Sequence, residues 1–334
     1  MSILVCGGAG YIGSHMVAAL VEKGYDTVVI DNLNMGHKEA IWPGASFYNC
    51  DIKDTAVLER IFKAHSIDAV VNFAAHMAVG ESVENPAKYY DNNITGTLIL
   101  LDQMLKHGVK KMVFSSSASV YGIPGRIPIT EAMPNDPISP YAETKLAAEK
   151  ILKWYDNAYG LKYTALRYFN VAGAHESGRI GEDHNPETHL IPMCLHAAQG
   201  KIPAFKLFGD DYPTPDGTCI RDYVHVMDLA DAHILALENL RDVSAIYNLG
   251  SQAGFSNKEI IAMAKKISGV DFHVEIHSRR PGDPPALIAS SEKIRRELGW
   301  NPKRTNIETI ISTAWAWHSA NPEGYAKTAP KEIR

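Results

Sequence analysis

Two residues with reactive side chains lie four positions apart near the middle of the chain. Tyr141 carries a phenol and Lys145 carries an ammonium group. Residues i and i+4 of a helix lie on one face, so both side chains can contact one ligand. A tyrosine with a pKa of about 10 is a poor base near neutral pH, but a neighbouring cation lowers that pKa. The pair therefore suits proton transfer, although any helix can carry this spacing by chance.

A glycine-rich turn follows the first apolar segment of the chain. Gly7, Gly10 and Gly13 come after the apolar residues 3–6 and before a helical pattern that continues to residue 21. Glycines in this context let the backbone approach a pyrophosphate, which the amino end of the helix faces. The spacing G-x-x-G-x-x-G resembles that of the short-chain dehydrogenase/reductase superfamily. We therefore expect a bound dinucleotide, with Tyr11 and Ile12 beside it.

An acidic residue ends the second expected strand, residues 27–30. Asp31 at this place can bind both hydroxyls of an adenosine ribose and would repel a 2′-phosphate. No arginine follows within residues 32–38, although Lys38 does, so tightly bound NAD is favoured over NADP. Capping of a backbone amide is the alternative role of Asp31. Further contacts with the cofactor are expected at later strand ends, from Asn32, Asp51, Ile52, Phe73, Ala74 and Ala75.

The composition excludes several classes of function. The 334 residues carry a net charge of −5, which disfavours binding to nucleic acid or an anionic membrane as the main task. The four cysteines are scattered without a C-x-x-C pair, and no histidines show H-E-x-x-H spacing, so no disulfide framework and no metal site are expected. The chain starts without a signal peptide pattern and has no apolar run of about 18 residues, which predicts a cytoplasmic protein.

Short apolar strands alternate with helical patterns over the first half of the chain. This order predicts an α/β fold with a Rossmann-type, doubly wound parallel sheet over residues 1–174, rejoined by a strand at 245–249. Helices are expected over 92–107 and 141–158. The composition changes after about residue 175, where expected loops are rich in Gly, Pro, Asp and His, such as 210–217 and 279–285. Residues 175–334 are therefore predicted to form a smaller, mixed α/β substrate-binding domain.

Residues 114–122 follow an expected strand and resemble a segment of the nucleotide-sugar enzymes, the extended branch of the superfamily. In those enzymes a hydroxyl residue, a tyrosine and a lysine handle a sugar hydroxyl together. Matching the motif assigns Ser117 to the hydroxyl position, with Ser116 as the alternative and backbone capping as the role of the remaining serines. The related dehydratases typically carry Asp or Glu here, and this segment has neither before Tyr121. Oxidation and re-reduction at one carbon are therefore favoured over elimination.

Several longer motifs narrow the resemblance to the UDP-glucose 4-epimerases. The stretch 208–226 is similar to the matching stretch of that family, and so are 79–83, 89–93 and 167–174. The resemblance extends from about residue 3 to about residue 318. It implies NAD-dependent epimerisation at C4 of UDP-hexoses, the interconversion of UDP-glucose and UDP-galactose in galactose metabolism. A homodimer formed through the helices 92–107 and 141–158 is also implied.

The family mechanism assigns a role to each catalytic residue. Tyr141, as tyrosinate, takes the proton of the sugar 4-hydroxyl while a hydride passes from C4 to NAD. Lys145 holds the nicotinamide ribose and lowers the pKa of Tyr141, and Ser117 hydrogen-bonds the 4-oxygen. The resulting 4-keto sugar turns and is reduced on its other face, so that C4 is inverted. Asn92 and Phe169 are implied as further contacts of NAD.

The resemblance also implies a binding site for the UDP-sugar. Its residues are Ser117, Tyr141, Asn170, His189, Leu190, Arg221, Arg280 and Asp283, of which Arg280 and Asp283 hold the diphosphate and the uridine ribose. Three positions depart from the family pattern. Met77 replaces a common lysine, His189 replaces a common asparagine, and Leu287 stands where some members carry tyrosine. Leucine there could leave room for an N-acetyl group, although simple repacking of the pocket is an equal alternative.

Other activities remain open at this stage. A 4-epimerase of UDP-pentoses (xylose and arabinose) or of UDP-N-acetylhexosamines would show nearly the same motifs. A reductase that consumes NADPH is disfavoured by Asp31. A catalytically silent regulatory protein would be expected to lack Tyr141 or Lys145, and both are present.

Overall fold

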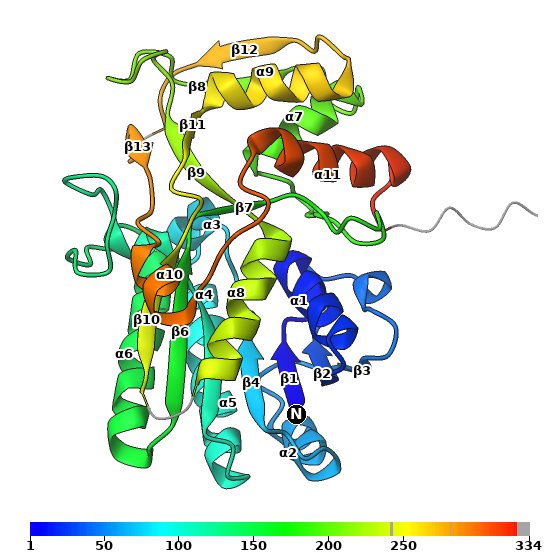
Figure 1. Cartoon of the computed structure of the whole chain (residues 1–334), viewed down its shortest axis with the longest axis vertical. Coiled ribbons are helices and arrows are strands. Elements are labelled where there is room, and N and C mark those ends of the chain that lie inside the picture. The colour runs from blue at the N-terminus through cyan, green and yellow to red at the C-terminus, as the bar shows by residue number, and fades with distance from the viewer. Residues whose placement is uncertain (241–242, 281, 326–334) are drawn as a thin grey trace, which may run out of the picture.

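Seven parallel strands form the central sheet of the protein, and they lie in the lower half of Figure 1. The computed structural model describes residues 1–240, 243–280 and 282–325. The strand order is β10-β6-β5-β4-β1-β2-β3. The strands are β1 (Ser2–Cys6), β2 (Asp26–Asp31), β3 (Ser46–Asn49), β4 (Ala69–Asn72), β5 (Lys111–Ser117), β6 (Lys162–Tyr168) and β10 (Ala245–Leu249). The order reverses between β1 and β4, and a ligand crevice is expected at this switch point.

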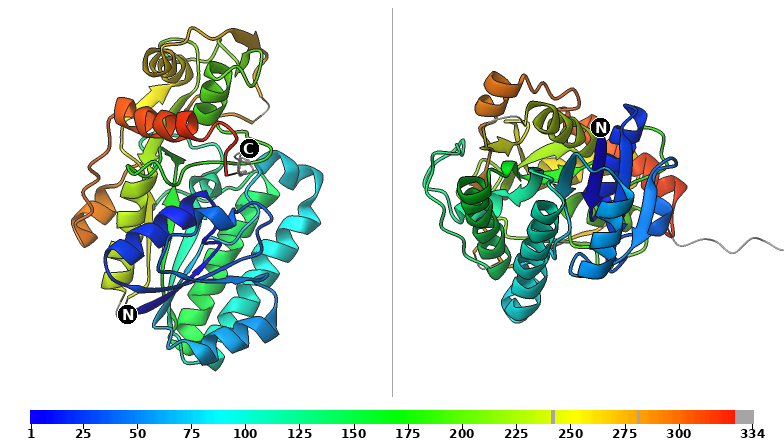
Figure 2. Two further views of the ribbon diagram at one scale, coloured as in Figure 1. Left: turned by 90° about the vertical axis from the view of Figure 1, so that its right-hand side faces the viewer. Right: turned by 90° about the horizontal axis from the view of Figure 1, so that it is seen from below.

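Helices cover both faces of this sheet, as the view from below in Figure 2 shows. Side chains of β1 alternate between two apolar clusters, Ile3 and Val5 in one and Leu4 and Cys6 in the other. The first cluster includes α1 (Tyr11–Glu22), α8 (Val226–Asn239) and α10 (Glu292–Leu298). The second includes α2 (Thr55–Ala64), α5 (Gly96–Lys106) and α6 (Pro140–Tyr159). Burial on both faces explains the continuous apolar runs of the sequence and confirms the predicted Rossmann-type α/β fold.

The two helices expected around the serine segment form differently. The second is α6, which begins at the N-cap Ser139 with Pro140 in its first turn and ends before Gly160 at φ 67°. The first was expected over 92–107 as one helix. It consists of α4 (Pro86–Tyr89), a π-helical turn η2 (Tyr90–Thr95) and α5. The remaining short helices of this half are η1 (Lys38–Ala40), α3 (Val79–Glu84) and η3 (Ala118–Tyr121).

A smaller lobe lies above the carboxyl edge of the sheet in Figure 1. Its strands are β7 (Asn170–Ala172), β8 (Phe205–Phe208), β9 (Ile220–His225), β11 (Gly254–Ser256), β12 (Val274–His277) and β13 (Ala286–Leu287). The strands β7, β11 and β13 each pair with β9, and β8 pairs with β12. A third apolar cluster packs these strands against α7 (Leu190–Ala198), α9 (Asn257–Ser268) and α11 (Ile307–Ala320). Residues 326–334 of the expected second domain lie outside the described residues.

The chain returns twice from the small lobe to the main sheet. The helix α8 packs against α1, and β10 pairs in parallel with β6 at the sheet edge. The helix α10 then packs beside β10. No helix within the described ranges is both long and apolar enough to span a membrane.

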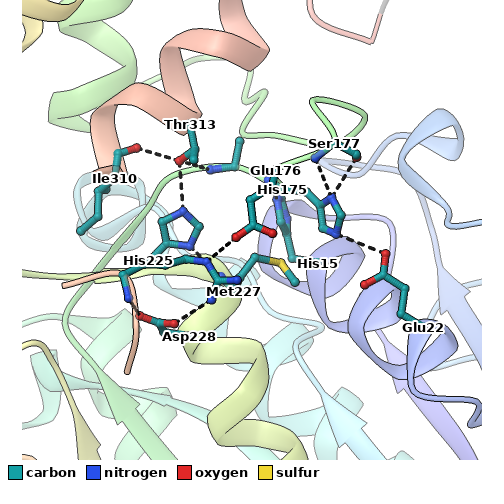
Figure 3. A network of polar contacts seen from close by, with 12 residues as sticks. His15, Glu22, His175, Glu176, Ser177, His225, Met227, Asp228, Ile310 and Thr313 are labelled. Atoms are coloured by element: carbon teal, nitrogen blue, oxygen red, sulfur yellow. Dashed lines mark hydrogen bonds and ion pairs between the residues drawn. The ribbon is translucent and has the colours of Figure 1, made fainter. Parts of the chain in front are cut away.

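A network of polar side chains connects the two lobes (Figure 3). We call loop 173–189, together with His15, His225 and Thr313 that contact it, the lobe junction. The Thr313 hydroxyl accepts from the Ala174 amide at 3.2 Å and lies 3.0 Å from Nε2 of His225. The His175 amide donates to Nε2 of His15 at 3.1 Å, while Nδ1 of His15 faces the Tyr11 carbonyl at 2.7 Å. These bonds fit neutral imidazoles.

Burial accounts for the neutral form of His15 and His225 in the lobe junction. It lowers the pKa of His15 to about 4, although the Tyr11 carbonyl opposes the change. It also lowers the pKa of His225 to about 3, with the charge of Arg304 in the same direction. A charged imidazole would lose its hydration in this interior, which explains both directions.

Candidate active site and cofactor crevice

The glycine turn after β1 packs directly against the end of β4. Gly7 has φ 77°, and a Cβ atom there would lie 2.7 Å from the Ala74 nitrogen. A Cβ atom on Gly13 would lie 2.0 Å from the Gly7 carbonyl oxygen. Any larger residue would therefore open the turn at both positions. The turn lies at the switch point of the sheet, where the dinucleotide was expected.

Gly10 shows that the turn fits a pyrophosphate. A Cβ atom on Gly10 would meet one atom of the described residues, the Gly7 oxygen at 3.5 Å, which is an ordinary contact. Gly10 is also the N-cap of α1, without a side-chain hydrogen bond to the first turn. Free backbone donors and an open approach at a helix start are what an anionic group requires. The residues present thus fit NAD at this place.

Asp31 lies at the end of β2 beside the glycine turn. Its carboxylate accepts from the Ala9 amide at 3.0 Å and from the Leu33 amide at 2.8 Å. Burial raises the pKa of Asp31, and these amide bonds oppose the rise. The side chain therefore has the capping role that was the alternative. Binding of a ribose by the same carboxylate stays a prediction.

The other expected cofactor contacts line the same edge. The Asn32 amide donates to Asp51 at 3.0 Å, and Asp51 also accepts from the Lys53 amide. Ile52 is buried, and Ala75 directly follows Phe73 and Ala74 after β4. Asn92 donates to Asn93, whose side chain holds the His76 backbone in the same loop. Strand ends of a parallel sheet meet at one edge, which explains why segments far apart in sequence converge here.

Ser117, Tyr141 and Lys145 come together at the carboxyl end of β5, and we call these three residues the catalytic edge. The Ser117 hydroxyl lies beside the Tyr141 phenol and acts to lower its pKa, and it accepts from the Ser119 amide at 3.2 Å and from the Ser119 hydroxyl at 2.9 Å. The Lys145 ammonium lies 5.8 Å from the centre of the Tyr141 ring and donates to the Ser115 carbonyl at 2.7 Å. The helix α6 presents Tyr141 and Lys145 on one face, as their spacing predicts.

The structure separates the three serines that the sequence left as alternatives. The Ser115 hydroxyl bonds the Tyr168 phenol. The Ser116 hydroxyl points into the interior and donates to Glu149 at 2.5 Å. Glu149 also pairs with Arg167, and both side chains are 3% exposed. Strand alternation puts Ser116 on the face opposite to Ser115 and Ser117, and the bond of Ser115 to Tyr168 leaves Ser117 as the serine of the three beside Tyr141.

The acid–base balance at the catalytic edge differs from the sequence prediction. We expected Lys145 to lower the pKa of Tyr141, and that expectation was wrong for the protein without ligands. Burial raises the pKa of Tyr141, and the neighbouring Ser117 hydroxyl offsets this only in part. Burial also lowers the pKa of Lys145 to about 7, against the charge of Glu149. Both shifts have one cause, the loss of hydration of a charged group in the interior.

The residues expected around the UDP-sugar gather along β9 of the small lobe. Arg221 pairs with Asp283 at 3.4 Å and also donates to the Pro284 carbonyl at 2.9 Å. The Arg280 guanidinium lies 4.1 Å from the ring centre of Phe208. The Asn170 amide donates to the Asp222 carbonyl at 3.1 Å. The expected roles of Arg280 and Asp283 toward the diphosphate and the uridine ribose stay predictions, and the contact of Asp283 with Arg221 was not foreseen.

His189 and Leu190 lie at the start of α7. The His189 imidazole lies 2.8 Å from Glu182 and 3.3 Å from Glu187. Its expected contact with the nucleotide stays a prediction, and these two carboxylates were not foreseen. Phe169 and Leu287 both pack against the apolar cluster of Val120, Tyr121, Ile129 and Leu146, which follows the catalytic edge in sequence. Met77 is an exposed side chain.

Asp222 is a positioning residue to which the sequence interpretation gave no role. Its buried carboxylate accepts from the amides of Ser251 at 2.7 Å and Ala289 at 3.0 Å. Burial raises the pKa of Asp222 to about 6, against these hydrogen bonds. The residue thereby holds the loop after β10 and the segment after β13 against β9. In the sequence, its importance was indicated by its position within the stretch 208–226, which resembles the matching stretch of the UDP-glucose 4-epimerases.

Known proteins are similar to this chain both in fold and in sequence. The sequence model of the NAD dependent epimerase/dehydratase family matches residues 3–250. The chain belongs to this family. It is 55% identical to the UDP-glucose 4-epimerase of Streptococcus mutans serotype c, over 97% of this chain and 99% of that protein. These findings confirm the predicted resemblance, and membership of the family confirms NAD as the cofactor.

Two solved structures agree with that assignment. A crystal structure of a UDP-glucose 4-epimerase superposes with a TM-score of 0.96 at 51% identity, over 98% of this chain and all of that one (100%). The UDP-glucose 4-epimerase from Bifidobacterium longum, in complex with NAD+ and UDP, superposes with a TM-score of 0.93 at 40% identity. That alignment covers 97% of the present chain and 100% of the Bifidobacterium chain.

Proposed function

We propose that the protein interconverts UDP-glucose and UDP-galactose by epimerisation at C4 of the sugar. The observation that carries this proposal is the catalytic edge, where the Ser117 hydroxyl and the Lys145 ammonium lie beside the Tyr141 phenol. The similarity to UDP-glucose 4-epimerases over nearly the whole length of the chain supports the same activity. The absence of a carboxylate from residues 115–120 favours epimerisation over elimination.

The glycine turn, Asp31 and the ends of β3 and β4 hold the cofactor in this proposal. NAD, when bound, supplies a hydride acceptor and donor for the sugar C4. The turn places the amino end of α1 toward the pyrophosphate, and Asp31 is placed to receive ribose hydroxyls. Lys145, which α6 holds at the same edge, is assigned to the nicotinamide ribose.

The proton steps belong to Tyr141 and Ser117. Tyr141 takes the proton of the sugar 4-hydroxyl and returns it to the 4-oxygen after the sugar has turned. Ser117 stays beside the phenol and orients the 4-oxygen toward it. Burial raises the pKa of Tyr141 in the protein itself, and a charged Lys145 ammonium beside the bound ribose would favour the tyrosinate. Proton transfer to Tyr141 therefore requires Lys145 in its charged form.

The small lobe recognises the nucleotide part of the substrate in this proposal. Arg221 in β9 and Arg280 beside Phe208 are cationic groups of this lobe, and a guanidinium donates paired, charge-assisted bonds to a phosphate. Asp283, which now pairs with Arg221, is a carboxylate that can accept from ribose hydroxyls. We assign Asn170, Leu190 and the exposed side of the His189 ring, through Nε2, to the same nucleotide site, because Nδ1 of His189 faces Glu182 and Glu187.

A direct test is the isomerisation of UDP-galactose by purified protein without added NAD. We expect UDP-glucose to form until equilibrium, with no net oxidation of any cofactor, because the hydride returns to the same carbon. Protein stripped of NAD should be inactive until NAD is restored. Stoichiometric consumption of added NAD or NADPH, or no isomerisation by NAD-loaded protein, would contradict the proposal.

UDP-N-acetylhexosamines are a second candidate substrate class, and Leu287 favours them. Leu287 pairs in register with Arg221 and, like Phe169, packs against the apolar cluster that includes Val120 and Tyr121, so it connects the proposed nucleotide site with the region after β5. Leucine is shorter than the tyrosine of some relatives and would leave space for an acetyl group. Comparable turnover of UDP-glucose and UDP-N-acetylglucosamine would support this, and Leu287→Tyr should then suppress only the second activity. A panel that includes UDP-xylose and UDP-arabinose tests the pentose alternative.

We further propose a cytoplasmic homodimer that acts in galactose metabolism. The family resemblance supports a dimer through α5 and α6, the helices that lie near the expected ranges 92–107 and 141–158. The division into a cofactor domain of residues 1–174 with the strand at 245–249 and a sugar domain of the remainder is proposed on the same basis. Light scattering of the purified protein would test the dimer.

A further inference from the structure

Four potential metal ligands converge in the loop that leads from β7 to α7. Glu182, His184, Glu187 and His189 each direct one nitrogen or oxygen atom to a common point, and these atoms all lie within 4.8 Å of one another. We call these four residues the Glu-His cluster. It belongs to the lobe junction and is separate from the catalytic edge.

The distances within the Glu-His cluster match a small coordination sphere. Nδ1 of His184 lies 3.3 Å from an oxygen of Glu182 and 3.6 Å from an oxygen of Glu187. Nδ1 of His189 lies 2.8 Å and 3.3 Å from oxygens of the same two residues. Tetrahedral Zn²⁺ with bonds of about 2.0–2.1 Å holds its ligand atoms about 3.3 Å apart. The four side chains are therefore close to the required arrangement.

Burial makes this grouping unusual. The side chains of Glu182 and Glu187 are 5% and 4% exposed, and that of His184 is 7% exposed. Among the described residues, Oε1 of Glu182, Nδ1 of His184 and Oε2 of Glu187 form no well-aligned hydrogen bond, although ion pairs of 2.8–3.6 Å join them to one another and to Nδ1 of His189. Buried polar atoms nearly always form well-aligned hydrogen bonds, so three such atoms around one point fit a site that takes a further partner.

We propose that the Glu-His cluster binds one divalent transition-metal ion of the Zn²⁺ class, through one oxygen of each glutamate and Nδ1 of each histidine. Imidazole nitrogen favours such metals over Mg²⁺ and Ca²⁺, which prefer sets of oxygen ligands. Two carboxylates also balance the two charges of the ion, so that the site, in which the side chains of Glu182, His184 and Glu187 are buried and that of His189 is 47% exposed, is neutral. Four protein ligands make a closed site, which is typical of a structural metal.

The ion would fix the lobe junction from the inside. His189 is the N-cap of α7, and His184 packs edge-on against Tyr11 of α1 with ring centres 6.2 Å apart. Tyr11 in turn donates to the Gly173 carbonyl at 2.6 Å, at the other end of the loop. A metal held by the four ligands therefore connects the start of α7 with the helix that follows the glycine turn. The competing arrangement is two protonated histidines paired with two glutamates, without metal.

Untagged wild-type protein tests the proposal without any variant. After dialysis against a chelator, the holoenzyme with NAD is titrated with ZnCl₂, and the bound metal is measured by mass spectrometry after gel filtration. We expect one retained equivalent per chain and a rise of the melting temperature with Zn²⁺ but not with Mg²⁺. Substitution by Co²⁺ should give the visible absorption of a tetrahedral nitrogen and oxygen site. No retained metal and no thermal shift would overturn the proposal.

Variants locate the bound ion. Replacing two ligands at once, with His184→Gln and Glu187→Gln, should abolish the retained equivalent, or weaken Zn²⁺ binding about 100-fold or more. The control is His277→Gln, which removes a histidine from an exposed pair with Glu275 at 3.3 Å and should leave binding unchanged. If the double variant is insoluble, the single Glu187→Gln variant serves. Stoichiometric Zn²⁺ that either variant still binds with wild-type affinity would place the ion elsewhere and overturn the proposal.

Discussion

The catalytic edge and the lobe junction both bring polar side chains into a dry interior, but by different means. At the catalytic edge, one strand and one helix present Ser117, Tyr141 and Lys145 through their regular periods. In the lobe junction, an irregular loop places Glu182, His184 and their partners through contacts with α1, α7 and α11. A site built on regular elements can thus be predicted from residue spacing. The geometry of a site built on a loop depends instead on the elements that contact the loop.

The largest effect is expected from the catalytic edge itself. Tyr141→Phe removes the proton acceptor and should reduce kcat by about 10³-fold, which is within the usual range for a general base. The melting temperature and NAD content should change little, because the ring and its packing remain. Isomerisation of UDP-galactose measures the rate. The control is Tyr159→Phe, an exposed tyrosine of the same helix, which should retain activity. Full activity of Tyr141→Phe would show that Tyr141 is not the base.

The buried ion pair behind the catalytic edge should control stability. Arg167→Met leaves the charge of Glu149 unpaired in the interior and should lower the free energy of unfolding by about 3–5 kcal/mol. Urea unfolding followed by fluorescence measures this change. Arg296→Met in an exposed pair with Glu297 should cost less than about 1 kcal/mol. Combining Arg167→Met with Glu149→Gln should recover part of the loss, and an unchanged loss would contradict the role of the pair.

Acid should weaken the lobe junction before it affects the sheet. Burial lowers the pKa of His15 to about 4 and of His225 to about 3, below the value of about 6.5 in the unfolded chain. A lowered pKa contributes stability that is full above pH 6.5 and is lost as the pH falls toward 4. Each histidine should cost up to about 3 kcal/mol over this window.

The measurement is urea unfolding at several values of pH between 6.5 and 4.5. His225→Gln cannot take up a proton, so its free energy of unfolding should fall less steeply with acid than that of the wild type. The exposed His277 serves as the matched control, and His277→Gln should keep the wild-type slope. Equal slopes for all three proteins would show that the buried histidine does not titrate as stated.

The smallest effects should distinguish two neighbouring serines. Ser117→Ala loses the hydroxyl beside Tyr141 and should lower kcat by about 10–100-fold, as expected for one positioned donor. Ser116→Ala loses the bond to Glu149 and should lower the free energy of unfolding by about 1–3 kcal/mol. Steady-state kinetics and urea unfolding of both variants separate the two roles. A loss of kcat in Ser116→Ala and a loss of stability alone in Ser117→Ala would instead assign the catalytic hydroxyl to Ser116.

The sequence predicted most of the catalytic edge and of the fold because local rules specify them. The glycine spacing and the alternating apolar runs indicated the parallel sheet, and the i, i+4 spacing indicated the shared face of Tyr141 and Lys145. The helical pattern around 92–107 is confirmed, although it begins with the π-helical turn η2, which residue spacing does not indicate. The lowered pKa expected for Tyr141 was wrong for the protein without ligands, because burial of the phenol could not be estimated from spacing.

The sequence by itself determined the class of fold, the cofactor crevice and the chemistry of the catalytic edge. Each depends on residue types at fixed separations within one strand, turn or helix. Only the tertiary structure decided that Ser117 faces Tyr141, that Asp283 pairs with Arg221, and that the Glu-His cluster closes around one point. These contacts join loops to distant elements, and their energies depend on burial, which no local pattern of residues specifies.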